Sequence, residues 1–117
     1  MNTNFDSAIN DLLENIIENY KQFATPGYKL DSSGFLSDQV KDFIDNLKVV
    51  PGKKYTKITS RGSAWGFIVA VDNDKKFRKG DILKPAGWAT PARNHARGNI
   101  LDGGYAISWT GPAYLRG

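Results

Sequence analysis

One stretch of the chain, Gly87–Asn99, gathers the side chains best suited to bind an anion. It reads Gly-Trp-Ala-Thr-Pro-Ala-Arg-Asn-His-Ala-Arg-Gly-Asn and contains the only histidine, two arginines and a tryptophan. The Thr-Pro pair near its start and the glycine near its end are typical of helix boundaries, so they predict a short helix over residues 91–97. Arg93 and Arg97 would then lie four residues apart, where their charges repel and favour an anion of this chain or of a ligand.

If this stretch binds nucleic acid, five of its residues would make the contacts. We expect Arg93 and Arg97 to contact phosphate and Trp88 to stack on a base. Asn94 and His95 would hydrogen-bond a base or a sugar. Each assignment has an ordinary alternative. The arginines could pair with Asp81, Asp102 or free carbonyls of the same chain, the tryptophan could cover the core, and the histidine could be an ordinary surface or loop-packing residue.

A second basic cluster stands just before that stretch. Its members are Lys75, Lys76, Arg78 and Lys79. They would attract a polyanion without reading its sequence, and a solvated turn is the ordinary alternative. The preceding Asp72-Asn73-Asp74 lacks the glycine and the distal glutamate of a calcium loop, so we expect a plain Asx turn and no metal site.

Charge divides the chain into two unlike halves. Residues 1–50 carry four lysines against eight Asp or Glu, a net charge of −4, whereas residues 51–117 carry twelve Lys or Arg against four Asp, a net charge of +8. A basic half suggests a polyanion partner, with surface solubility as the equal alternative.

The acidic half is predicted to be helical. Apolar residues recur every three or four positions from Phe5 to Phe23, which predicts an amphipathic helix with Thr3 as its cap. A helix that packs on its own barrel is favoured over one that mediates subunit contact. A second helix, capped by Ser37, would bury Val40, Phe43, Ile44 and Leu47.

After Pro51 the period of the apolar residues changes to that of strands, separated by glycine and aspartate turns. Strands are predicted at Tyr55–Ser60 and Ala64–Val71, then one entered through Gly80-Asp81, and finally a hairpin around Asp102-Gly103-Gly104. Short strands at this spacing are typical of a small barrel. The chain is therefore expected to be one compact α+β domain, with residues 1–50 as a helical segment packing on a barrel formed by residues 51–117.

Two predicted strands leave a choice open. Strand 64–71 would place four apolar side chains on one face, those of Trp65, Phe67, Val69 and Val71. Its other face is also apolar, so it lies between two layers or meets another chain. In the last strand, Tyr105 and Trp109 share a face with an isoleucine. That stripe is interpreted as core in preference to a base-stacking platform.

The composition argues against an enzyme. The chain has no cysteine, one histidine and no glutamate after Glu18, so general bases are scarce. Asp72, Asp74 and Asp81 are interpreted as turn residues in preference to nuclease metal ligands. No cofactor is expected. Without a basic leader or an apolar run of membrane-spanning length, a soluble cytoplasmic protein is expected.

Several segments resemble a known family. They are Asp42–Lys57 (DFIDNLKVVPGKKYTK), Trp65–Lys84 (WGFIVAVDNDKKFRKGDILK), Trp88–Asn99 (WATPARNHARGN) and Trp109–Pro112 (WTGP). Together they are similar to a group of small Sm-like proteins known from marine metagenomes and attributed to cyanophages. The resemblance covers most of residues 40–115. The usual Sm signatures are missing, so no uridine-pocket residue is carried over.

The resemblance implies a helix followed by a strongly bent, five-stranded antiparallel SH3-like barrel. It also implies assembly through edge strands into a homo-oligomeric ring, with a pentamer favoured, and binding of nucleic acid, with RNA favoured over DNA. A role in phage or host RNA or DNA processing would follow, in the host cytoplasm if the chain is phage-encoded. The alternative is a structural or adaptor oligomer of a phage without a nucleic-acid ligand.

Overall fold

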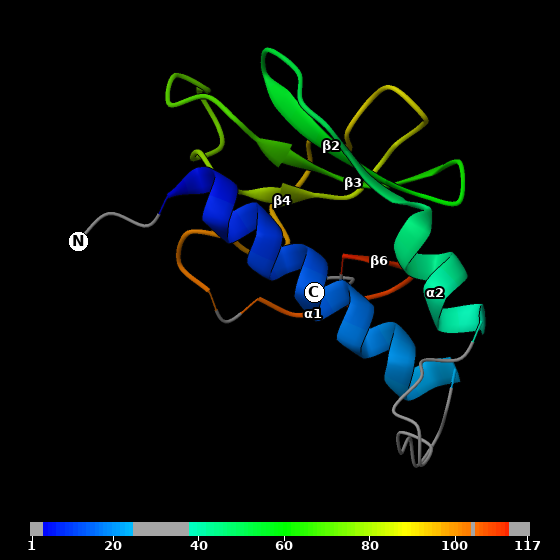
Figure 1. Cartoon of the computed structure of the whole chain (residues 1–117). Helices are drawn as coiled ribbons and strands as arrows, with labels where there is room; N and C mark the ends of the chain where they lie inside the picture. Colours follow the sequence, from blue (N-terminus) through cyan, green and yellow to red (C-terminus); the bar gives the residue numbers. More distant parts are fainter. Residues whose placement is uncertain (1–3, 25–37, 104, 113–117) are drawn as a thin grey trace.

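The computed structural model describes residues 4–24, 38–103 and 105–112. Its elements are α1 (Phe5–Ala24), α2 (Asp38–Asp45), β1 (Leu47–Val50), β2 (Tyr55–Ser60), β3 (Ser63–Val69), β4 (Ile82–Leu83), β5 (Ile107–Ser108) and β6 (Gly111–Pro112). The first four strands form an antiparallel sheet in the order β1-β2-β3-β4, and β5 pairs with β6. Helix α1 crosses one face of this sheet (Figure 1). The α+β class is confirmed, while in the described part of the chain no closed barrel forms and the five-stranded barrel stays a prediction.

Helix α1 begins at a capping asparagine. Asn4 Oδ1 accepts hydrogen bonds from the backbone N–H groups of Asp6 and Ser7, at 2.7 and 3.3 Å, as an N-cap side chain does. The predicted cap, Thr3, lies outside the described residues. The buried face of α1 comprises Ala8, Ile9, Leu12, Ile16 and Tyr20. It joins Ile58, Trp65, Ile68 and Ile82 of the sheet in one core, so α1 packs on the sheet of its own chain as expected, while the barrel itself stays a prediction.

The sheet begins earlier than predicted. Helix α2 ends at Asp45, and the side chain of Asn46 donates to the Asp42 carbonyl at 2.9 Å, which closes the last turn. Leu47, expected on the buried face of that helix, instead starts β1 and pairs with Ser60 of β2. The valines that follow Leu47 favour a strand, so the boundary between a helical segment 1–50 and a sheet from residue 51 is wrong. Ser37 lies outside the described residues.

A β-bulge moves Trp65 to the other face of β3 from the one predicted. Ile58 pairs with Gly66 and Thr59 pairs with Ala64, so Trp65 is the extra residue on its strand. Trp65 consequently packs with the α1 core, whereas Phe67 and Val69 pack on the other face. The prediction that these three share a face is wrong.

Both faces of β3 are covered within the subunit. A second cluster joins Phe67 and Val69 to Phe77 and Leu83 on the face away from the α1 core. A strand buried between two layers has no apolar face left for another chain. Of the two interpretations left open for β3, the one with two layers is confirmed.

The C-terminal hairpin lies later than predicted. Gly103 N–H donates to the Asn99 carbonyl at 3.1 Å, which makes residues 99–103 a turn, and Gly104 is outside the described residues. The strands that pair are β5 and β6, with Ser108 opposite Gly111. The Trp109 N–H of the intervening loop donates to Asn19 Oδ1 of α1 at 2.9 Å, which ties the hairpin to the helix.

The aromatic stripe of this C-terminal segment belongs to the core. Tyr105, Ile107 and Trp109 are partly buried and pack against the cluster that α1 forms with the sheet. The interpretation of the stripe as core is therefore confirmed over that of a base-stacking platform.

Candidate nucleic-acid interface

The stretch Gly87–Asn99 is not a helix. It turns back and runs beside β4, where Ala92 N–H donates to the Lys84 carbonyl and Arg97 N–H to the Ile82 carbonyl, each at 2.7 Å. The predicted helix over residues 91–97 is wrong because β4 offers unpaired backbone groups to this segment. A helix of two turns is too short to compete with that pairing.

Gly98 is needed for a reason other than ending a helix. Its φ is +140°, which side chains rarely tolerate. A Cβ at this position would lie 2.6 Å from the Cβ of Tyr105. The glycine therefore lets the segment beside β4 pass close to the chain at Tyr105.

The predicted arginine pair does not form. Between the two anchoring bonds, Arg93, Asn94 and His95 are exposed. Arg97 turns toward its own loop, with Nε donating to the His95 carbonyl at 3.2 Å and Nη2 lying 3.5 Å from Asn94 Oδ1. Asn94 and His95, two of the five residues predicted to contact nucleic acid, therefore lie beside Arg97.

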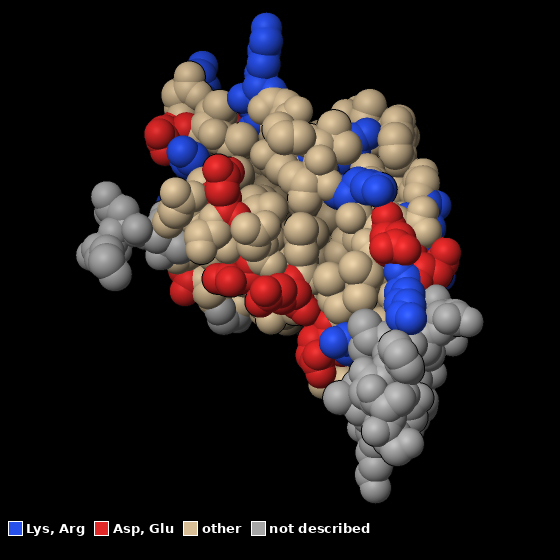
Figure 2. Space-filling view, in the orientation of Figure 1, with Lys and Arg blue, Asp and Glu red and all other residues tan. Residues whose placement is uncertain are grey.

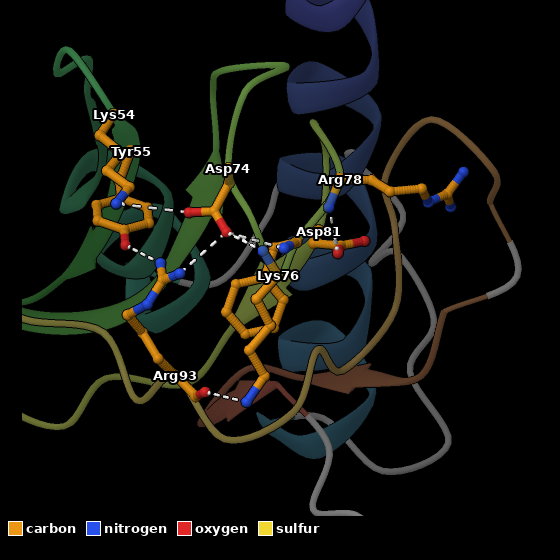
Figure 3. Close-up of polar contacts among 8 residues, drawn as sticks. Lys54, Tyr55, Asp74, Lys76, Arg78, Asp81 and Arg93 are labelled. Atoms are coloured by element: carbon orange, nitrogen blue, oxygen red, sulfur yellow. Dashed lines mark hydrogen bonds and ion pairs between the residues drawn. The ribbon is translucent and has the colours of Figure 1, made fainter.

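Arg93 holds its loop against the sheet. Its Nη2 donates to Asp74 Oδ1 at 2.9 Å, its Nη1 donates to the Tyr55 hydroxyl, and its guanidinium lies 4.9 Å from the Phe77 ring centroid. Lys76 Nζ donates to the Arg93 carbonyl at 2.8 Å. Figure 3 shows Arg93 rising from its loop toward Asp74. The ordinary alternative, a pairing within the chain, is correct for Arg93, but the acidic partner is Asp74 and not Asp81 or Asp102.

Asp74 is the centre of this arrangement. Its Oδ1 also accepts the backbone N–H groups of Lys76 and Phe77, at 2.8 and 2.9 Å, so the predicted Asx turn is confirmed. The hydrogen bond from Arg93, followed by these two backbone bonds, holds the pKa of the Asp74 carboxyl well below its usual range. The side chain is only 1% exposed, and these three hydrogen bonds keep it charged in spite of its burial.

A pocket of about 440 Å³ opens beside this carboxylate. The residues that line it, called the basic pocket below, are Lys53, Lys54, Val71, Asn73, Asp74, Lys75 and Arg93. Four cationic side chains face one carboxylate, a net charge of +3. Such a surface attracts anions and repels cations.

The second predicted cluster is divided by the fold. Lys75 lines the basic pocket and Lys76 bonds the loop of Arg93. Arg78 pairs with Asp102 and points away from Asp74 (Figure 3). Lys79 Nζ lies 5.5 Å from the ring centroid of Phe5, at the start of α1.

Trp88 stands on the surface. It is 56% exposed, so the alternative in which it covers the core is wrong. Lys57 Nζ lies 3.6 Å from its ring centroid and donates to its carbonyl at 2.8 Å. A cation held over the ring at this distance makes a favourable cation–π contact. The indole keeps an exposed aromatic surface on which a base could stack.

The sequence interpretation missed Lys53, Lys54 and Asn73. The pairing of β2 with β3 could have indicated these residues. Tyr55 pairs with Val69, so the residues just before β2 lie beside those just after β3. A hairpin register through Arg61-Gly62 would have brought Lys53 and Lys54 next to Asp74.

Within residues 4–24, 38–103 and 105–112, no group of three or more His, Cys, Asp or Glu could hold a metal ion. Asp81, one of the three aspartates weighed as a ligand, instead accepts hydrogen bonds from Asn99 and from the Arg78 N–H. None of the helices in these ranges is long and apolar enough to cross a membrane.

Neither a protein-family model, nor a curated protein, nor a solved structure matches this chain. The resemblance to the marine Sm-like group therefore stays a prediction.

Proposed function

We propose that this protein binds nucleic acid through the basic pocket and the surface around it. The observation that carries the proposal is the convergence of four cations and a single carboxylate on one pocket of about 440 Å³. Arg93 is already bonded to Asp74, so Lys53, Lys54 and Lys75 are the groups that would contact phosphate. Phosphate contacts of this kind supply most of the affinity for nucleic acid, independently of its sequence.

The distribution of charge supports a defined orientation of the bound strand. Acidic side chains gather along α1 (Figure 2), where Asp11, Glu14 and Glu18 are exposed. A polyanion would be repelled from that face and drawn to the basic pocket.

The resemblance extends this proposal in three respects. It favours RNA over DNA, and it favours a homo-oligomeric ring, with a pentamer preferred, in which several basic pockets would act on one strand. It also places the activity in phage or host RNA or DNA processing, without catalysis by this chain. Exposed Trp88, Asn94 and His95 would then add base contacts beside the pocket.

A titration tests the proposal. Fluorescence anisotropy of labelled single-stranded RNA and DNA would be followed at several salt concentrations with the full chain. We expect binding that weakens steadily as salt rises. An absence of binding to either strand at low salt would contradict the proposal.

A second candidate function is that of a structural or adaptor oligomer, which would assemble through the edge of the sheet. Strand β1 is the first strand of the sheet order and Val50 at its end is 46% exposed. An exposed strand edge can pair with another chain. Light scattering of wild type and of Val50→Lys would test this use of the edge, and a monomeric wild type would reject both the adaptor and the ring.

A further inference from the structure

One buried oxygen atom of the basic pocket lacks a hydrogen bond. Asp74 Oδ1 accepts three, but among the described residues no group donates a hydrogen bond to Oδ2, although this atom is shielded from solvent. Its nearest cation is Lys54, whose Nζ lies 3.5 Å away. A buried acceptor without a donor is uncommon in proteins and calls for a partner.

The contact between Lys54 and Asp74 Oδ2 is weak. Its side chain is 53% exposed, and 3.5 Å is long for a charge-assisted hydrogen bond. Figure 3 shows Oδ2 pointing toward Lys54 and Oδ1 toward Arg93. A ligand in the pocket that displaces Lys54 Nζ would take its place at Oδ2, while the bonds of Oδ1 hold the carboxylate in place.

The charges of the basic pocket limit what this partner can be. A metal cation is disfavoured because four cationic side chains line the pocket. A phosphodiester group alone satisfies the lysines, but it has no proton to donate to Oδ2 and is repelled by it. The ligand must therefore carry an anionic group and, close to it, a neutral O–H or N–H donor.

We propose that Asp74 Oδ2 accepts a hydrogen bond from the 2′-hydroxyl of one ribonucleotide unit of a single-stranded RNA, whose adjacent phosphate is held by Lys53 and Lys75. This inference rests on the proposed nucleic-acid function and gives it a means of telling RNA from DNA. In RNA the 2′-hydroxyl adjoins the 3′-phosphate, so a donor and an anion lie close together, and the 2′-hydroxyl is the group that distinguishes the two polymers. A pocket of about 440 Å³ is in the size range of sites for one small ligand.

Deoxyribose would leave Oδ2 unpaired. A site that hydrogen-bonds a ligand hydroxyl discriminates strongly against the analogue that lacks it. A hydrogen bond to a charged group corresponds to a preference of about tenfold or more, and competition from Lys54 keeps the expected value near the lower end.

The experiment uses the unmodified protein and four labelled single strands of the same base sequence. Their sugars are ribose, 2′-deoxyribose, 2′-O-methylribose and 2′-fluororibose, and affinity is measured by anisotropy at one low salt concentration. We expect ribose to bind about tenfold more tightly than the other three, because none of them can donate from the 2′ position. The modified strands keep every base N–H, so a donor on a base would leave the four affinities alike.

The variant Asp74→Asn isolates the atom concerned. Its amide oxygen can keep the bonds of Oδ1, while its NH₂ replaces the acceptor Oδ2, so the preference for ribose should shrink to about threefold or less. The matched control is Asp72→Asn, an exposed aspartate two residues away, which should keep the full preference. Thermal melts of both variants check that they fold.

The outcomes separate the two proposals. Equal affinity of the wild type for all four strands overturns the hydroxyl contact and leaves nucleic-acid binding intact. Binding of none of the strands at low salt overturns the function itself. An undiminished ribose preference in folded Asp74→Asn assigns the discrimination to another residue and also overturns the inference.

Discussion

Removing charge from the basic pocket should flatten the salt dependence of RNA binding. The double variant Lys53→Gln, Lys75→Gln takes away two of the three lysines that line the pocket and leaves Lys54. For single strands, the slope of log K against log salt is about −0.7 for each phosphate contact. Three contacts for each subunit therefore give a slope of about −2, and one remaining contact gives about −0.7.

These slopes correspond to changes in affinity that are readily measured. Between about 50 and 200 mM salt, the wild-type pocket should lose roughly 20-fold in affinity and the double variant roughly threefold. If several subunits act on one strand, both slopes are multiplied, but their ratio of about three is unchanged. Glutamine keeps most of the length of the lysine side chain, so the pocket should not collapse.

Anisotropy titrations at four salt concentrations would provide the slopes. Lys48→Gln is the matched control, because Lys48 is an exposed lysine of β1 that does not line the basic pocket. A slope as steep in the double variant as in wild type would refute the reasoning, and so would an equal flattening by the control.

Three further predictions concern the scaffold and the surface. Asn99→Ala should lower the free energy of unfolding by about 2 kcal/mol in urea, because the buried amide donates to Asp81 Oδ1 at 2.9 Å and its loss leaves that oxygen without this donor; an unchanged midpoint would contradict this. The depressed pKa of Asp74 should stabilise the fold above the unfolded-state pKa of about 4, and this contribution should be lost as pH falls below it. The melting temperature of Asp74→Asn should therefore fall less than that of wild type upon acidification, and parallel curves would argue against the Arg93 contact. Trp88→Ala should weaken RNA binding by about 1–3 kcal/mol without changing the melting temperature, whereas a lower melting temperature would place the indole in the fold.

The helices and the core were the most predictable parts of this chain. The three- and four-residue spacing from Phe5 to Phe23 predicts α1 and its buried face, since one apolar stripe needs one partner surface. The faces of β3 were not predictable, because a bulge at Trp65 shifts the alternation by one residue. A bulge arises from the pairing of two strands and leaves little trace in either one alone.

The candidate site shows the same limit. Local signals around Pro91 predict a helix, but backbone groups of β4 capture the segment. The basic character of the region was evident from the sequence, whereas the pairing of Arg93 with Asp74 depends on two loops that only the fold brings together. Lys53 and Lys54 were missed because their importance comes from the register of β2 against β3.

Mapping the contact surface by NMR tests the central claim most directly. The amide resonances of the labelled full chain would be followed as unlabelled single-stranded RNA is added at low salt. We predict that the shifted signals cluster at residues 53–57, 71–76 and 93–97, around the basic pocket, and that the exposed face of α1 is unaffected. Shifts centred on α1, or no shifts at saturating RNA, would contradict the account.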